Sequence, residues 1–135
     1  MKANDIRNLD SVPSPSLLVF PGRIERNIRK MLAMVGGDTS RLRPHVKTHK
    51  MPEVVRMQVA AGITQFKCAT LAEVEMTATA GGRDILLAYQ PVGPNMERFL
   101  GLQERHGVLE GLDLLLLLRS RRGRRLLVVL QLYFF

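Results

Sequence analysis

Five basic or titratable side chains occupy every second position between residues 41 and 49. In an extended strand successive side chains point to opposite faces, so this spacing predicts a strand over residues 42–49 with one basic face. A strand with one cationic face and one face that can pack is typical of the floor of an anion-binding site. The members of this basic face are Arg41, Arg43, His45, Lys47 and His49.

Lys47 lies at the centre of the basic face, and its amine is the candidate nucleophile. Neighbouring positive charges and partial burial both disfavour an ammonium ion. The neutral amine is the form that attacks a carbonyl carbon. We therefore expect Lys47 to act as a nucleophile.

The composition is that of one globular domain with a basic surplus. The chain has 135 residues, of which 46% are hydrophobic, and a formal net charge of +8. This charge allows a nucleic-acid or anionic-surface interface as an alternative function. Single-strand binders stack bases on aromatic rings, and few aromatic residues lie among these charges. Nucleic acid is therefore the less favoured partner.

Cysteine usage and hydropathy indicate a reducing compartment and no membrane span. Cys68 is the single cysteine, which excludes an internal disulfide, and the sequence contains no Cys-x-x-Cys pair that would predict a metal site. The first thirty residues lack the apolar stretch of a signal peptide, and no apolar window is long enough to cross a bilayer. We expect a cytoplasmic protein without a membrane partner, in which Cys68 is a small buried side chain.

The elements that position Lys47 follow from an alternation of short apolar runs with segments of helical spacing. Glycine stops and the capping-box form Thr70-Leu-Ala-Glu73 mark helix ends and starts. This order predicts an α/β fold with parallel strands, either a barrel or an open doubly wound sheet, and reactive groups at the carboxyl ends of the strands, where Lys47 and Tyr89 fall. The predicted strands cover residues 17–20, 42–49, 63–69 and 84–89, and the predicted helices cover residues 24–35, 52–62, 70–81 and 95–106.

Residues 108–135 differ in composition from the rest of the chain. Leucine and arginine occur there in blocks, and no acidic residue follows Asp113. We favour a truncated or frameshifted chain in which this tail is not homologous to what precedes it. The alternative is two further strands, over residues 112–118 and 126–132, joined by a basic turn. The sequence predicts one unit over residues 1–107 followed by a separate tail.

The segment Arg43-Pro-His-Val-Lys-Thr-His-Lys50 resembles the signature of the D-threonine aldolase and D-serine dehydratase group, fold-type III pyridoxal-phosphate enzymes related to the alanine racemase N-terminal domain. Supporting segments follow in the same order: Pro15-Ser-Leu-Leu-Val19, Arg26-Asn-Ile28, Cys68-Ala-Thr-Leu-Ala-Glu73 and Asp84-Ile-Leu-Leu-Ala-Tyr-Gln-Pro91. The resemblance covers about residues 10 to 105. It implies a partial (β/α)8 TIM-type barrel with parallel strands alternating with helices.

The resemblance also implies residue roles. Lys47 carries pyridoxal 5'-phosphate and moves protons, and His49 is a second candidate for proton transfer. Cofactor contacts are expected from Lys47, His45, Arg43 and Tyr89, although each histidine is equally a candidate for a structural hydrogen bond. Full-length members carry a divalent metal in a carboxyl-terminal domain, and its ligands have no counterpart in this sequence, so no metal residue is predicted.

The implied activity is that of a lyase for a small-molecule substrate, a D-β-hydroxy amino acid. Retro-aldol cleavage of the D-threonine aldolase type is favoured, and β-elimination of the D-serine dehydratase type is the alternative. A homodimer is expected from the resemblance alone. If the tail reflects truncation, this chain is an inactive fragment of such an enzyme.

Overall fold

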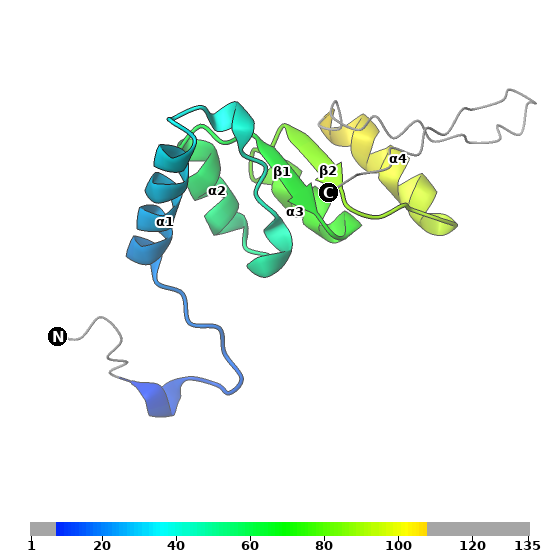
Figure 1. The fold of residues 1–135 in the computed structure, drawn as a ribbon. Coiled ribbons are helices and arrows are strands. Elements are labelled where there is room, and N and C mark those ends of the chain that lie inside the picture. The colour runs from blue at the N-terminus through cyan, green and yellow to red at the C-terminus, as the bar shows by residue number, and fades with distance from the viewer. Residues whose placement is uncertain (1–7, 108–135) are drawn as a thin grey trace, which may run out of the picture.

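The computed structural model describes residues 8–107, which contain four helices and two strands (Figure 1). Three short 3-10 turns accompany them: η1 (Leu9–Ser11), η2 (Thr39–Arg41) and η3 (Val46–Thr48). In chain order, the helices and strands are α1 (Pro21–Met34), α2 (Pro52–Ala60), β1 (Gln65–Cys68), α3 (Leu71–Thr79), β2 (Asp84–Leu87) and α4 (Pro94–His106).

Local sequence signals account for the helix boundaries. Helices α1, α2 and α4 each begin with proline, whose fixed φ suits the first helical position and whose missing N–H would have no intrahelical partner there. Helix α3 begins after Thr70, whose hydroxyl accepts a hydrogen bond from Glu73 N at 3.1 Å. Helix α4 ends at His106 and is capped by Gly107, which adopts a left-handed φ of 59°. The four predicted helices are confirmed.

The strands form a small parallel sheet. Strand β1 pairs with β2 in the register Gln65 to Asp84 through Cys68 to Leu87. On its other edge β1 meets the segment before η3, because His45 forms a parallel bridge with Lys67 and Lys67 N donates to Pro44 O at 2.9 Å. The spatial order is therefore the His45 segment, β1 and β2, all running in one direction. This confirms the predicted parallel α/β arrangement.

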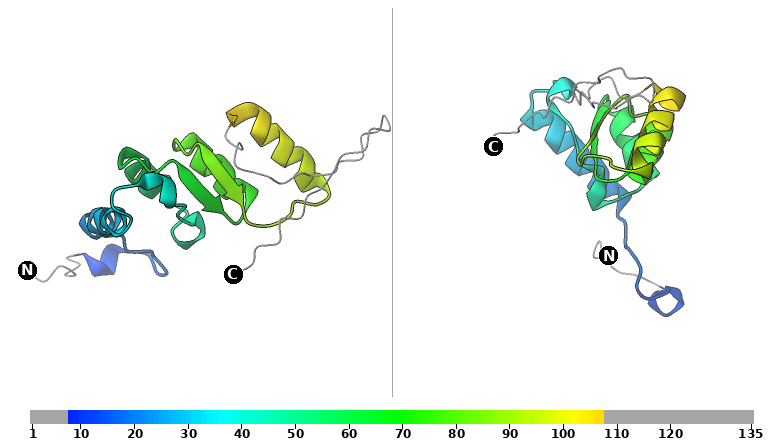
Figure 2. Two further views of the ribbon diagram at one scale, coloured as in Figure 1. Left: turned by 45° about the horizontal axis from the view of Figure 1, so that its top comes forward. Right: turned by 90° about the vertical axis from the view of Figure 1, so that its right-hand side faces the viewer.

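Helices cover one face of the sheet and leave the other more open. Buried and half-buried residues alternate along both strands, as expected for a sheet with one packed face. In the right-hand view of Figure 2, α3 and α4 lie to one side of the strands. The half-buried positions Gln65, Lys67, Asp84 and Leu86 define what we call the open face. The packed core comprises Val46, Val55, Ile63, Phe66, Cys68, Leu71, Val74, Ala80, Ile85, Leu87, Phe99 and Leu102.

The predicted strand over residues 17–20 is wrong. These residues form an arm that leads into α1 and extends away from the sheet (Figures 1 and 2). The Leu17 side chain is 72% exposed, and no described residue pairs with this segment as a strand. An apolar run forms a strand only where a neighbouring strand accepts its backbone hydrogen bonds.

Two further predictions concern the ends of the chain and membranes. The tail, with its boundary at residue 107 and its alternative strands over 112–118 and 126–132, lies outside the described residues. Between residues 8 and 107, no helix has the length and apolar character that crossing a bilayer requires.

Candidate active site

The predicted alternation of the basic strand holds from residue 43 to residue 46 and then ends. His45 pairs with Lys67 of the open face, and Val46 on the opposite side is fully buried in the core. At Val46 the chain enters η3 instead of continuing as a strand. Arg41 is also outside the strand, because it is the last residue of η2. The predicted strand over 42–49 is thus reduced to a bridge at His45.

The side chain of His45 explains why the strand stops. Its Nδ1 accepts a hydrogen bond from Lys47 N at 3.3 Å, so the imidazole satisfies an amide that a strand would direct to a neighbour. Lys50 N then donates to Val46 O at 2.9 Å, and Lys50 adopts a positive φ of 51°. The chain therefore reverses over residues 46–50, which we call the lysine turn, and the exposed Lys47 lies within it.

Both histidines use one ring nitrogen to hold the lysine turn. His49 Nδ1 accepts a hydrogen bond from Met51 N at 3.1 Å, as His45 Nδ1 does from Lys47 N. Only an unprotonated nitrogen accepts, so each neutral ring carries its proton on Nε2. Burial lowers the pKa of both rings, and for His45 the charges of Lys47 and Lys67 add to the effect. The histidines are therefore neutral rings that present an Nε2–H donor.

Arg43 is not brought together with Lys47. Its guanidinium forms a two-pronged ion pair with Asp84, at 2.7 Å to Oδ1 and 2.5 Å to Oδ2. It also donates to the carbonyl oxygens of Phe66 at 3.3 Å and Asp84 at 3.2 Å. These contacts hold the His45 segment to β1 and to the first residue of β2. The carboxyl ends of the strands, beyond which Lys47 lies, are at the other end of the sheet.

Tyr89 lies at the same end of the sheet as Lys47, beyond the carboxyl ends of the strands. It follows β2 by two residues, and its side chain is 39% exposed. Ala88 N donates to Cys68 O at 2.7 Å, which fastens the segment after β2 to the end of β1. Lys47 and Tyr89 leave strand positions two sheet spacings apart, about 10 Å for the backbone.

Sequence reasoning missed two charged residues beside the lysine turn, Lys67 and Glu73. Lys67 is the bridge partner of His45 on the open face. Its signal was its place in Gln65-Phe-Lys-Cys68, where Phe66 and Cys68 face the core and Lys67 faces the opposite way. Glu73 is buried near the start of α3, with Oε1 3.7 Å from Lys50 Nζ. It was recognised only as part of a helix cap.

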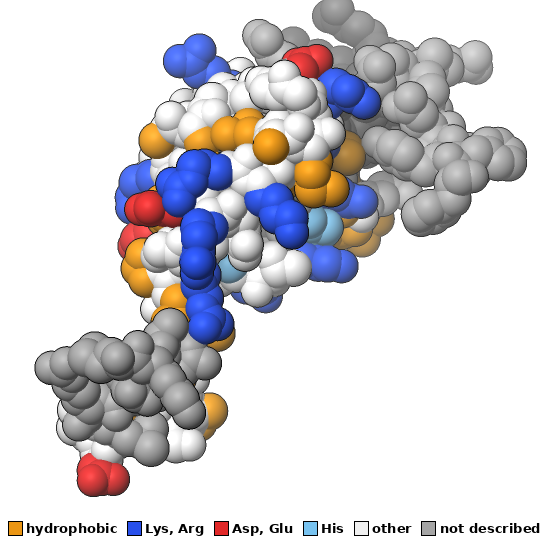
Figure 3. All heavy atoms as spheres, turned by 60° about the vertical axis from the view of Figure 1, so that its left-hand side comes forward, with side chains coloured by type: hydrophobic (Ala, Val, Ile, Leu, Met, Phe, Trp, Pro, Cys, Tyr) orange, Lys and Arg blue, Asp and Glu red, His pale blue; other side chains and the backbone are white. Residues whose placement is uncertain are grey.

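The surface carries basic groups and histidines together. Figure 3 shows histidine side chains adjoining lysine and arginine side chains on one face of the molecule. Cys68 is fully buried as predicted, and burial raises the pKa of its thiol to about 11. Within residues 8–107, no three side chains among His, Cys, Asp and Glu gather as metal ligands.

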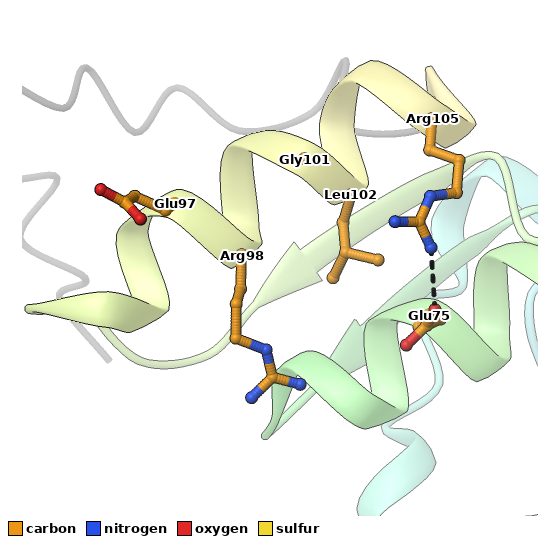
Figure 4. A pocket seen from close by; sticks show the side chains of 6 residues that line it. All are labelled: Glu75, Glu97, Arg98, Gly101, Leu102 and Arg105. Atoms are coloured by element: carbon orange, nitrogen blue, oxygen red, sulfur yellow. Dashed lines mark hydrogen bonds and ion pairs between the residues drawn. The ribbon is translucent and has the colours of Figure 1, made fainter.

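A groove between α3 and α4 is separate from this site (Figure 4). It encloses about 310 Å³ and contains an ion pair of 3.2 Å between Arg105 and Glu75. None of the predicted site residues lines it. Its lining consists of Glu75, Glu97, Arg98, Gly101, Leu102 and Arg105.

The lysine turn occurs in a chain with recognisable relatives. Residues 20–133 match the profile of the family described as alanine racemase, N-terminal domain. A D-threonine aldolase of Arthrobacter sp. is 36% identical over 93 residues, which cover 69% of this chain and 24% of that protein. A D-threo-3-hydroxyaspartate dehydratase of Delftia sp. is 34% identical over 110 residues, 82% of this chain and 28% of that protein. The chain spans about a quarter of the length of these relatives.

A solved structure agrees with the sequence relatives. It is a histidine-to-alanine mutant of D-threo-3-hydroxyaspartate dehydratase, similar with a TM-score of 0.61 at 35% identity over 70% of this chain and 24% of that chain. The predicted partial barrel is therefore confirmed, and the family match extends past residue 107 to residue 133. The chain belongs to the alanine racemase N-terminal domain family, within the fold-type III group of pyridoxal-phosphate enzymes.

Proposed function

We propose that this chain holds pyridoxal phosphate covalently through Lys47, as part of a lyase that acts on D-β-hydroxy amino acids. The observation that carries the proposal is the position of Lys47 in an exposed turn beyond the carboxyl end of a strand in a parallel α/β unit. Reactive groups of such folds lie at this end. The relatives are named for D-threonine and D-threo-3-hydroxyaspartate, both of which are D-β-hydroxy amino acids.

The side chains of the described region fit an anionic aldehyde cofactor. Lys47 offers an exposed primary amine, and Lys67 and Lys50 add positive charge around it. The Nε2 of His49, close to the turn, is buried without a hydrogen-bond partner in residues 8–107. When bound, pyridoxal phosphate accepts the electrons released as a bond to the substrate α-carbon breaks.

The residues of this chain have distinct tasks in the proposal. Lys47 would hold the cofactor through Nζ, and its amine, when free, would take up or return a proton. His45 and His49 hold the lysine turn through Nδ1. Tyr89 is proposed as a cofactor contact at the neighbouring strand end. Arg43 is left out of this set because its guanidinium is engaged by Asp84.

We propose retro-aldol cleavage as the reaction of the whole protein. Cleavage of the Cα–Cβ bond of D-threonine would give glycine and acetaldehyde. The dehydratase relative supports the second candidate, loss of the α-proton and the β-hydroxyl as water. Hydrolysis of the imine tautomer of the resulting enamine would then give ammonia and a 2-oxo acid. This elimination includes the D-serine dehydratase type of reaction. Product analysis with D-threonine, D-serine and D-threo-3-hydroxyaspartate separates the reactions.

Spectroscopic titration with pyridoxal phosphate tests the cofactor proposal without requiring turnover. We expect an absorption band of the lysine-bound cofactor that Lys47→Ala abolishes. Lys30→Ala, which alters an exposed lysine of α1, should retain the band. If neither variant changes the titration and DNA is retained in a salt-sensitive manner, the chain is a basic binding module instead.

The remaining features of the whole protein are also proposals. A homodimer is proposed from the family and is tested by light scattering of the purified chain. A cytoplasmic location is proposed from the single cysteine, Cys68, which fits a reducing compartment. A divalent metal is proposed for the full-length protein on the basis of the family resemblance alone.

A further inference from the structure

Glu73 is unusual among the described residues because it is charged and buried. Its side chain is 4% exposed, and the other buried polar residues of the described region, Gln58 and Thr77, are neutral. Removing a carboxylate from water is costly unless cations or hydrogen bonds compensate. The compensation therefore indicates what the residue does.

One oxygen of Glu73 is sufficient for the helix cap. Oε2 accepts a hydrogen bond from Ala69 N at 2.7 Å, while the backbone N–H of Glu73 donates to Thr70 Oγ1 at 3.1 Å. A glutamine at this position caps a helix in the same way, so capping alone does not require a charge. Oε1 is buried without a hydrogen-bond partner in residues 8–107.

The second oxygen faces the end of the lysine turn. Oε1 lies 3.7 Å from Lys50 Nζ, whose residue closes the turn with a positive φ and a hydrogen bond from its N–H to Val46 O. Turn η3 also contacts α3 and β1 directly. The Glu73–Lys50 ion pair thus joins the start of α3 to the turn that contains Lys47.

The charge of Glu73 also reaches both histidines of the turn. Burial lowers the pKa of His45 and His49, and the Glu73 carboxylate opposes this effect in both rings. Lys47 and Lys67 act on His45 in the same direction as burial. Glu73 therefore supplies the negative charge beneath a group of basic side chains.

We propose that Glu73 is a positioning residue for Lys47, whose buried carboxylate clamps the lysine turn against the carboxyl end of β1 through Lys50 and Ala69 N. This inference rests on the proposed role of Lys47 as the cofactor lysine. It assigns to a helix-cap residue a second task that depends on its charge and not on its size.

Histidine titration by NMR, without cofactor, tests the electrostatic part. Glu73→Gln preserves shape and a capping oxygen but removes the charge, so the pKa values of His45 and His49 should fall below those of the native chain. Glu75→Gln is the matched control, because Glu75 lies on the same helix in an exposed pair with Arg105. Unchanged histidine pKa values in Glu73→Gln would overturn the proposal.

Trapping with borohydride tests the positioning part. At a fixed pyridoxal-phosphate concentration we expect Glu73→Gln to reduce the rate of labelling of Lys47 by about tenfold, a typical consequence of losing a hydrogen bond or ion pair to a charged group. Glu75→Gln should label at the native rate. If Glu73→Gln does not fold by circular dichroism, Lys50→Gln removes the exposed half of the pair and should slow labelling in the same direction.

The outcomes separate this inference from the proposed function. Native labelling rates in both Glu73→Gln and Lys50→Gln would overturn the positioning role and leave the role of Lys47 intact. A native chain that is never labelled at Lys47 would refute the proposed function, whereas the NMR titration would still report on the clamp.

Discussion

The ion pair between Arg43 and Asp84 should contribute strongly to stability and little to cofactor binding. The two side chains are 29% and 25% exposed, and two charged contacts of 2.7 and 2.5 Å join them. Breaking a buried pair costs about 3–5 kcal/mol, whereas an exposed pair contributes about 0–1 kcal/mol. With this intermediate exposure, we expect Arg43→Ala to lower the free energy of unfolding by about 2–3 kcal/mol.

The loss follows from what the substitution leaves behind. Without the guanidinium, the Asp84 carboxylate loses its cation, and the carbonyl oxygens of Phe66 and Asp84 each lose a donor. Arg43→Lys should recover only part of the loss, because an ammonium cannot make the two-pronged contact.

Equilibrium unfolding in urea measures this effect. Arg56→Ala is the control, since Arg56 lies 3.9 Å from Glu53 in an exposed pair, and it should cost less than about 1 kcal/mol. If Arg43→Ala unfolds at the same urea concentration as the native chain and binds pyridoxal phosphate more weakly, the structural role is refuted. Arg43 would then be a cofactor contact, as expected from the sequence.

Other consequences concern pH, packing and thiol reactivity. Burial lowers the folded-state pKa of His45 below 6.5, so at acid pH the folded chain binds fewer protons than the unfolded chain. The free energy of unfolding should therefore decrease as pH falls through 6.5 toward the lower folded pKa. His45→Asn should reduce this decrease, as measured by urea unfolding at pH 8 and pH 5. Gly82→Ala places a Cβ 2.8 Å from a side-chain carbon of Thr77 and should destabilise the fold by about 1–3 kcal/mol. Gly101→Ala meets open space in α4 and should stabilise the fold by about 0.5–1 kcal/mol. Equal shifts of the melting temperature in the two variants would contradict this reasoning. The buried Cys68 thiol, with its pKa raised to about 11, should resist a thiol reagent at pH 8 until the chain is unfolded, and rapid labelling of the native chain would be inconsistent with the core.

The helices and the two strands were predictable because their signals are local. Proline begins α1, α2 and α4, and a threonine cap begins α3, so the sequence marks these boundaries directly. The apolar run at residues 17–20 carries the same kind of local signal as β1 and β2. Whether this run forms a strand depends on a neighbouring strand to pair with, which the local sequence does not specify.

The site was predictable only in part, because two of its ion pairs join residues that lie far apart in the sequence. Alternation correctly placed Arg43 and His45 on one face, but the imidazole of His45 captured Lys47 N and ended the strand. The ion-pair partner of Arg43, Asp84, is 41 residues away in the sequence, and no sequence motif predicts this pairing. Likewise, the pattern around Glu73 indicated a cap and gave no sign that its second oxygen faces Lys50.

The account depends most directly on which amine holds pyridoxal phosphate. Peptide mapping by mass spectrometry, after the native chain is incubated with pyridoxal phosphate and reduced with borohydride, measures the occupancy of each lysine. We predict that the label is concentrated on Lys47, with Lys50 and Lys67 essentially unlabelled. A label on Lys50, or one spread evenly over the exposed lysines, would contradict the central claim.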